Sequence, residues 1–407
     1  MTSDLYVWLW LPKATEPVVC GRLLQDGGRL SFVYGRSYAA REDAIALMPE
    51  RMPLTSEPFL ARRMGQLPAP LADAAPDAWG RRVIEYRNRQ GGFGELDYLS
   101  LSHGERIGAL HFQESASEYA PFEVRTATLA ELLAAAEALE RCQPLSPALA
   151  AALEHGTSIG GARPKATLRD GDRWLIAKFA SNTDRFAIVR AEYAMLRLAQ
   201  RCGISTPGAW LRNVAGKDVL IVERFDRTSA PRGVLRRHLL SALSLLDLDD
   251  TEARLASYPQ FAELLRRLAR EGAADAREVF RRMVFNILTG NTDDHAKNHA
   301  AFWDGQWLEL TPVYDLVPTL RAGQEAEQAM IVGSSGRAST LANALSEAGR
   351  FGLRAPEASM IVDEVESTIA GHWRREFTAC GVTEEQIAML EGRAVLSPVS
   401  RLRALSS

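Results

Sequence analysis

Residues 290–298 read Gly-Asn-Thr-Asp-Asp-His-Ala-Lys-Asn, and this stretch decides which fold is expected for the rest of the chain. Asp293 and Asn298 lie five positions apart. At that spacing the carboxylate can accept the proton of an attacking hydroxyl group while the amide oxygen binds Mg²⁺ beside phosphate groups. A short hairpin and a second metal-binding carboxylate should follow, and Tyr314-Asp315 does follow a strand–turn–strand pattern over residues 300–310. The stretch therefore predicts Asp293 as the catalytic base and Asn298 and Asp315 as metal ligands.

If residues 290–298 form the catalytic loop of a kinase, an ATP-binding lobe must lie earlier in the chain. The pair Asp170-Gly171 is a strong hairpin signal, and the strand after it ends in Leu175-Ile176-Ala177-Lys178. That ending is close to the Val-Ala-Ile-Lys strand whose Lys binds the α and β phosphates of ATP in protein kinases. Before the hairpin, residues 158–165 read SIGGARPK, and adjacent glycines let a backbone approach phosphate oxygens closely. The residues predicted to bind nucleotide in these two segments are Ser158, Gly160, Gly161, Lys165 and Lys178.

A second hairpin is expected around Gly216, and its exit at residues 222–227 would form the hinge between two lobes. The backbone groups of Glu223 and Phe225 are expected to bind adenine there. Glu192 lies on the helix expected between the two hairpins. It could pair with the Lys at the end of the first hairpin, as a helix Glu does in protein kinases.

The histidines beside the predicted base allow another interpretation. His295 and His299 are four residues apart, which suggests a transition-metal site, but such a pair without a third placed ligand is common by chance. His295 is expected instead to orient the loop by hydrogen bonds. Lys297 could bind the cofactor by screening charge on the γ-phosphate, or it could be a solvated side chain. A metal-dependent hydrolase built on Asp293, Asp294 and both histidines stays open, although it leaves the glycine-rich segment unexplained.

Five segments, taken in their order along the chain, resemble the HipA-type toxin kinases. They are SIGGARPK (158–165), LIAKF (175–179), VERFDR (222–227), RRMVFNILTGNTDDHAKNHA (281–300) and TPVYDLVP (311–318). The resemblance implies a bacterial Ser/Thr protein kinase that uses ATP and Mg²⁺ and is the toxin of a toxin–antitoxin module. It also implies a HipB-like helix-turn-helix antitoxin as partner, with DNA bound only through that antitoxin, and an aminoacyl-tRNA synthetase as the substrate.

The same resemblance places an inhibitory autophosphorylation site on Ser158. The chain departs from the best-known family pattern nearby, because Gly-Ala-Arg-Pro-Lys stands at residues 161–165 where that pattern has Gly-Ala-Gln-Glu-Lys. Pro164 stiffens the segment and the loss of an acid makes it more basic. The change bears on how readily a modified loop moves, while the ATP site itself is expected to be unaffected.

The expected fold class is α+β, in a two-lobed kinase-like fold preceded by a strand-rich domain. We expect a HipA-like N-terminal domain over residues 1–115, a small mixed β/α lobe with the glycine-rich segment over 116–224, and a mainly helical lobe over 225–407. Thr128-Leu129-Ala130-Glu131 predicts a helix start by its capping box. Residues 321–345, which are rich in Gly and Ser, are expected to form a mobile loop.

Composition limits the remaining possibilities. The 407 residues carry 48 Lys plus Arg against 51 Asp plus Glu, a formal charge of −3 that does not favour direct nucleic-acid binding. The four cysteines share no Cys-x-x-Cys spacing, which fits a reducing compartment. No apolar run reaches the ~18 residues needed to span a bilayer. We therefore expect a cytoplasmic protein that does not associate with membranes.

Two other functions remain open at this point. One is a catalytically weak co-repressor that acts with a DNA-binding antitoxin, although such a scaffold would not need Asp293, Asn298 or Asp315. The other is a small-molecule kinase, because the ATP-binding half of a site cannot distinguish among acceptors.

Overall fold

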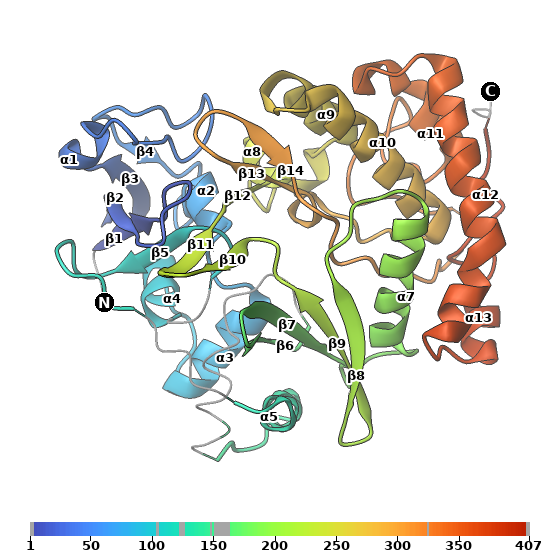
Figure 1. Ribbon diagram of the computed structural model, residues 1–407, viewed down its shortest axis with the longest axis horizontal. Helices are drawn as coiled ribbons and strands as arrows, with labels where there is room; N and C mark the ends of the chain where they lie inside the picture. Colours follow the sequence, from blue (N-terminus) through green and yellow to red (C-terminus); the bar gives the residue numbers. More distant parts are fainter. Residues whose placement is uncertain are drawn as a thin grey trace. The chain divides into compact units, whose positions relative to one another are not determined.

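The computed structural model describes residues 4–102, 106–121, 127–146, 149, 163–323 and 325–403. The chain forms two compact units that are interleaved along the sequence. The first unit comprises Met1–Thr183, Trp210–Leu240 and Trp303–Gln306. The second comprises Asp184–Ala209, Ser241–Phe302 and Trp307–Ser407. Sheets dominate the described part of the first unit, whereas helices dominate that of the second (Figure 1).

The first unit begins with a five-stranded antiparallel sheet of order β4-β3-β2-β1-β5. Side chains alternate along β3 (Arg29–Tyr34), where Leu30, Phe32 and Tyr34 are buried. This period of two is the pattern of a strand with one face in the core. The other strands are β1 (Asp4–Leu9), β2 (Val18–Asp26), β4 (Phe59–Leu60) and β5 (Leu110–Gln113), and the helices are α1 (Arg36–Ala39), α2 (Ala69–Ala72), α3 (Ala78–Asn88) and α4 (Glu95–Leu101).

A four-stranded sheet of order β6-β7-β9-β8 follows in the same unit. Its two hairpins confirm the predicted turns, because Gly171 and Gly216 both have the positive φ that tight turns require. The predicted capping box is also present, with Thr128 and Glu131 bonded reciprocally at the start of α5 (Leu129–Glu140). The strands are β6 (Lys165–Asp170), β7 (Arg173–Phe179), β8 (Ala209–Val214) and β9 (Lys217–Glu223).

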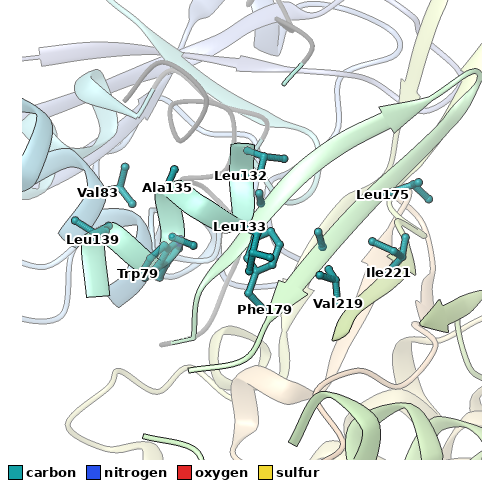
Figure 2. Close-up of a cluster of buried hydrophobic side chains, with 13 residues drawn as sticks. Trp79, Val83, Leu132, Leu133, Ala135, Leu139, Leu175, Phe179, Val219 and Ile221 are labelled. Atoms are coloured by element: carbon teal, nitrogen blue, oxygen red, sulfur yellow. The ribbon is translucent and has the colours of Figure 1, made fainter. Parts of the chain in front are cut away.

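One face of this sheet packs on helices α3 and α5 (Figure 2). Trp79 from α3, Leu132 from α5 and Phe179 from β7 are among the buried side chains of the cluster. A fully buried aromatic or aliphatic side chain contributes roughly 1.5–3 kcal/mol to folding. The cluster therefore fixes β6 and β7, the strands that carry Lys165 and Lys178, against the helices.

Two short strands, β10 (Arg227–Ala230) and β11 (Gly233–Arg236), form a hairpin after the expected hinge, and β12 (His238–Ser241) follows. Arg224 Nη2 lies 2.7 Å from Asp226 Oδ2, and both side chains are buried. A buried ion pair therefore lies at the expected hinge. Asp226 also accepts a hydrogen bond from the Gly108 amide, which ties the hinge to the segment before β5.

The second unit is built around α10 (Gly272–Thr289), which packs against α9 (Tyr258–Leu268) and α12 (Ala355–Ala379). No helix among the described residues is long and apolar enough to cross a membrane. The remaining helical elements are α7 (Ile188–Arg201), α8 (Ala242–Leu245), η1 (Ala253–Leu255), η2 (Ala296–Asn298), α11 (Leu341–Ser346), η3 (Ala348–Phe351) and α13 (Glu384–Leu390). β13 (Ala300–Trp303) and β14 (Leu308–Leu310) form the hairpin predicted after the catalytic loop.

The described part of residues 321–345 differs from the expected mobile loop. Gln328, Met330, Val332 and Ser339 have no exposed surface, and α11 begins inside the segment. The expectation failed because Gly and Ser were taken as signs of a loose surface turn. Here Gly333 is required by close packing, since a Cβ at that position would lie 2.0 Å from the Asn343 carbonyl oxygen.

Candidate active site

The predicted catalytic loop begins where α10 ends. Gly290 caps the helix in the left-handed conformation, with φ of 71°. A Cβ there would also lie 2.6 Å from the Ala394 carbonyl oxygen, so both conformation and space demand glycine. The Thr319 amide donates a hydrogen bond of 2.9 Å to the Gly290 oxygen. The start of the loop is therefore fixed on two sides.

A buried polar cluster lies under the loop. Asn286 Nδ2, on the last turn of α10, donates to Asp294 Oδ2 at 2.6 Å and to the Tyr258 hydroxyl at 3.3 Å. Asn286 Oδ1 accepts a bond of 3.1 Å from Asn291 Nδ2, so the whole amide is engaged. His299 Nε2 lies 2.9 Å from Asp294 Oδ1, a close approach without the alignment of a hydrogen bond. These contacts fix the residues on both sides of Asp293.

Asp293 and Asn298 lie in one compact turn. Asn298 Nδ2 donates to the Asp293 carbonyl oxygen at 3.2 Å, which leaves Oδ1 as the amide's acceptor atom. The His295 amide donates to the same oxygen at 3.0 Å, and the Asn298 amide donates to the His295 carbonyl oxygen at 2.8 Å. Asp293 is exposed, and its carboxylate has no hydrogen-bond or ion-pair partner among the described residues. The turn thus presents a carboxylate to solvent from a rigid backbone.

Asp315 lies half-buried after β14 and has a φ of 60°. The left-handed conformation is unfavourable for most residues with a side chain, although Asp tolerates it better than most. The neighbouring Tyr314 hydroxyl donates to the Lys297 carbonyl oxygen at 2.7 Å. This bond joins the segment of Asp315 to the turn that carries Asn298.

The ammonium group of Lys297 is already paired. Its Nζ lies 2.5 Å from Asp250 Oδ1, and both side chains are largely exposed. An exposed pair of this kind contributes little to stability and exchanges readily with other partners. The solvated interpretation of Lys297 and the phosphate interpretation therefore both stay compatible with the structure.

In the first unit, Lys165 and Lys178 stand directly opposite each other on β6 and β7. Opposite residues of an antiparallel pair point to the same face, and like charges there repel unless an anion lies near. Lys165 is 3% exposed, and its Nζ lies 3.4 Å from Asp77 Oδ2. Burial raises the pKa of Asp77 to about 6, although the nearby Lys165 ammonium acts to lower it. Trp79 Nε1 donates to the Lys165 carbonyl oxygen at 3.1 Å.

The other predicted nucleotide-binding residues are placed as follows. Glu223 ends β9, and its carboxylate lies 3.8 Å from an Arg173 guanidinium nitrogen, so its side chain is directed to β7. Phe225 follows at the hinge and is half-buried. Glu192 is buried on α7 in the second unit. Ser158, Gly160 and Gly161 lie outside the described residues.

The buried polar residues that hold the catalytic loop were not predicted from the sequence. Asn286, Asn291 and Asp294 are all at least 98% buried, yet polar residues in a helix end and a loop give no sign of burial in a sequence. His299 lies in this cluster, whereas His295, which was expected to orient the loop, contributes backbone bonds. Within the described ranges no group of three or more His, Cys, Asp or Glu side chains could hold a metal.

Comparison with known families identifies the chain. The profile of the HipA-like C-terminal domain matches residues 157–373, and that of the HipA N-terminal domain matches residues 11–113. The first match alone spans more than half of the sequence. The chain therefore belongs to the HipA family, and the resemblance drawn from its motifs is confirmed.

Individual relatives agree with this assignment. "Putative kinase Y4mE" of Sinorhizobium fredii is 26% identical over 327 residues, covering 74% of this chain and 75% of that protein. "Serine/threonine-protein kinase toxin HipA" of Shewanella oneidensis is 27% identical over 186 residues, covering 39% of this chain and 42% of that protein. A chain in the solved complex of Shewanella oneidensis HipA, HipB and operator DNA has a TM-score of 0.70 and 18% identity, covering 95% of this chain and 94% of its own length. The predicted α+β, two-lobed kinase-like fold is thereby confirmed.

Proposed function

We propose that this HipA-family chain is an ATP- and Mg²⁺-dependent Ser/Thr protein kinase. The turn of residues 293–298 is the observation that carries the proposal. It exposes the Asp293 carboxylate and orients the Asn298 amide through its bond to the Asp293 carbonyl oxygen. A scaffold without catalysis has no need for this arrangement, and relatives of the chain bear kinase names.

The side chains fit the groups that such a reaction requires. Asn298 Oδ1 and the Asp315 carboxylate are hard oxygen ligands, the kind that Mg²⁺ prefers. Lys178 and Lys165 supply positive charge from one face of a sheet, which suits phosphate oxygens. Mg²⁺–ATP, when bound, would supply the transferable phosphate and neutralise charge on it.

Asp293 would act on the acceptor. Its carboxylate orients the hydroxyl group of a Ser or Thr and accepts the proton as the phosphate is transferred. Glu223 and Phe225 would hold adenine through their backbone groups. Lys297 would approach the γ-phosphate after exchanging its exposed partner Asp250.

The family assignment supports a toxin–antitoxin role for the kinase. A HipB-like helix-turn-helix antitoxin would then neutralise the chain, with DNA bound only through that antitoxin. The proposed substrate is a translation component such as an aminoacyl-tRNA synthetase. Autophosphorylation of Ser158 would add about −1.5 to −2 charge to a segment that is to hold phosphates, and it would inactivate the enzyme.

The test is a phosphorylation assay in a cell lysate with Mg²⁺ and radiolabelled ATP. Wild-type protein should label discrete protein bands, whereas Asp293→Ala should lose roughly 100-fold or more of the transfer rate, the usual share of a general base. Calorimetry should show nearly unchanged Mg²⁺–ATP affinity in Asp293→Ala. Turnover of that variant within a few-fold of wild type would refute the catalytic assignment.

The same assay separates the kinase from a catalytically weak co-repressor. A co-repressor would bind an antitoxin and operator DNA while labelling no protein in either variant. A small-molecule kinase would consume ATP and label no protein band, but it would still depend on Asp293.

A further inference from the structure

Residues 326–339 form a hairpin in the second unit, and Gln328, Met330, Val332, Gly333 and Ser339 are its buried residues. The Gln328 amide donates to the Arg337 carbonyl oxygen at 2.8 Å, and the Ser339 amide donates to the Ala326 carbonyl oxygen at 2.9 Å. Gln328 and Ser339 thus lie side by side at its open end, and neither has exposed surface. We name this segment the 326–339 hairpin.

The closed end of the 326–339 hairpin is fixed to α11. Asn343 Oδ1 accepts a bond of 2.8 Å from the Ser335 amide, and Asn343 Nδ2 donates to the Gly336 carbonyl oxygen at 3.0 Å. The middle of the hairpin is fixed to the start of α9, where the Tyr258 amide donates to the Ile331 carbonyl oxygen at 3.0 Å. The hairpin is therefore a rigid body held at two places.

One side chain joins this rigid body to the catalytic loop. Gln328 Nε2 donates to the Asn291 carbonyl oxygen at 3.0 Å, while Gln328 Oε1 accepts a bond of 3.0 Å from Ser339 Oγ. Asn291 lies two residues before Asp293 and is bonded to Asn286 by both its backbone amide and its side chain. Both ends of the Gln328 amide are thus used, one on the hairpin and one on the loop.

We propose that Gln328 is a positioning residue for the catalytic loop. Through it, the 326–339 hairpin holds the backbone from which the Asp293 carboxylate projects. This assignment rests on the proposed kinase function, and it gives a role to a segment that contains none of the predicted ATP-binding or metal-binding residues.

The physical reason lies in the cost of an unpaired buried group. Removing the Gln328 donor would leave the buried Asn291 carbonyl oxygen without that bond, which is unfavourable unless the loop shifts to find another partner. A shift of the loop moves Asp293, and a displacement of about 1 Å at a catalytic group can cost ~100-fold in rate. The expected effect therefore falls on kcat, while nucleotide affinity is largely retained.

Three variants test the proposal. Gln328→Met keeps the length of the side chain and loses both hydrogen bonds. Gln328→Glu keeps size and polarity, accepts from Ser339, and loses the donor to Asn291. Ser339→Ala is the matched control at equal burial. It removes the bonds of Ser339 Oγ to Gln328 Oε1 and Arg321 Nη2, and it leaves the bond between Gln328 and the loop in place.

The measurements are kcat, KM for ATP, melting temperature and backbone amide exchange at residues 291–295. We expect kcat of both Gln328 variants to fall about tenfold or more, while their KM for ATP stays within about twofold of wild type. Their backbone amide hydrogens at residues 291–295 should exchange faster. Ser339→Ala should keep kcat within about twofold. A Gln328 variant with wild-type kcat and exchange would overturn the proposal, as would an equal kcat loss in Ser339→Ala.

The exchange measurement separates this inference from the proposed function. If wild-type protein transfers no phosphate, the kinase proposal fails, whereas faster exchange in Gln328→Glu still supports the link to the loop. Unchanged exchange in a folded Gln328→Glu rejects the link whatever the activity. If Gln328→Met does not fold, Gln328→Glu carries the test.

Discussion

Asp315 combines two demands at one position. The proposed metal site needs its carboxylate, and its backbone has the left-handed φ of 60°. Asn shares the tolerance of Asp for this conformation, whereas Ala lacks the short polar group that eases it. Charge and conformation can therefore be separated by substitution.

Asp315→Asn and Asp315→Ala should both weaken Mg²⁺-dependent ATP binding, because each removes a charged oxygen ligand. Asp315→Ala should in addition unfold more easily than Asp315→Asn by about 1 kcal/mol, because Ala lacks the short polar side chain that eases the left-handed conformation. Calorimetry with Mg²⁺–ATP and urea denaturation measure the two effects. Wild-type affinity in Asp315→Asn would assign the metal to other ligands, and equal stability of both variants would remove the conformational argument.

At the scale of elements, the end of α10 determines where the catalytic loop starts. Gly290→Ala should destabilise the protein by at least 1–2 kcal/mol, roughly the cost of φ at 71° alone, and the 2.6 Å approach to Ala394 adds to it. Gly349→Ala is the control, because Gly349 is exposed in η3 with no atom near its Cβ position. The midpoint of urea unfolding should fall for Gly290→Ala and stay or rise for Gly349→Ala. Equal midpoints would contradict this account of the helix end.

Turns and helix ends could be predicted in part from the sequence. Asp170-Gly171 and the capping box at Thr128 were predicted because each depends on residues a few positions apart. The same holds for the spacing of Asp293 and Asn298. Gln328 could not be predicted, since its partner lies 37 residues away and only the folded chain brings them together. Residues 321–345, which include the 326–339 hairpin, were predicted as a mobile loop because composition does not show burial.

The stability of the whole molecule should depend on His238. Burial lowers its pKa to about 4, and its Nε2–H group lies 2.8 Å from the Leu47 carbonyl oxygen. An unfolded His has a pKa of about 6.5, so the unfolded state binds a proton first as pH falls. Stability is then lost between about pH 6.5 and 4, by about 2 kcal/mol between pH 7 and pH 5.

Asp77 and Asp275 oppose this trend, because burial raises the pKa of each to about 6 and stability is gained as they are protonated. The comparison that isolates His238 is therefore with His238→Gln, which can still donate to Leu47 and does not titrate. The melting temperature of wild type should fall more between pH 7 and pH 5 than that of His238→Gln. The same fall in both proteins would show that His238 is already charged or is exposed in the folded state.

The first unit is completed by Trp303–Gln306, a few residues at the tip of the β13–β14 hairpin. Trp303 Nε1 donates to the Ala46 carbonyl oxygen at 2.8 Å, and a Cβ on Gly305 would lie 2.3 Å from Ile45 Cγ2. During synthesis on the ribosome, Ile45 and Ala46 are translated long before Trp303 and Gly305. Their contact can form only after about three quarters of the sequence has been translated. The nascent chain therefore cannot finish its first unit before nearly half of the second has been translated. A single cut in the gene therefore cannot separate the two units. Either unit, expressed from one of the two pieces, would lack a segment that belongs to it.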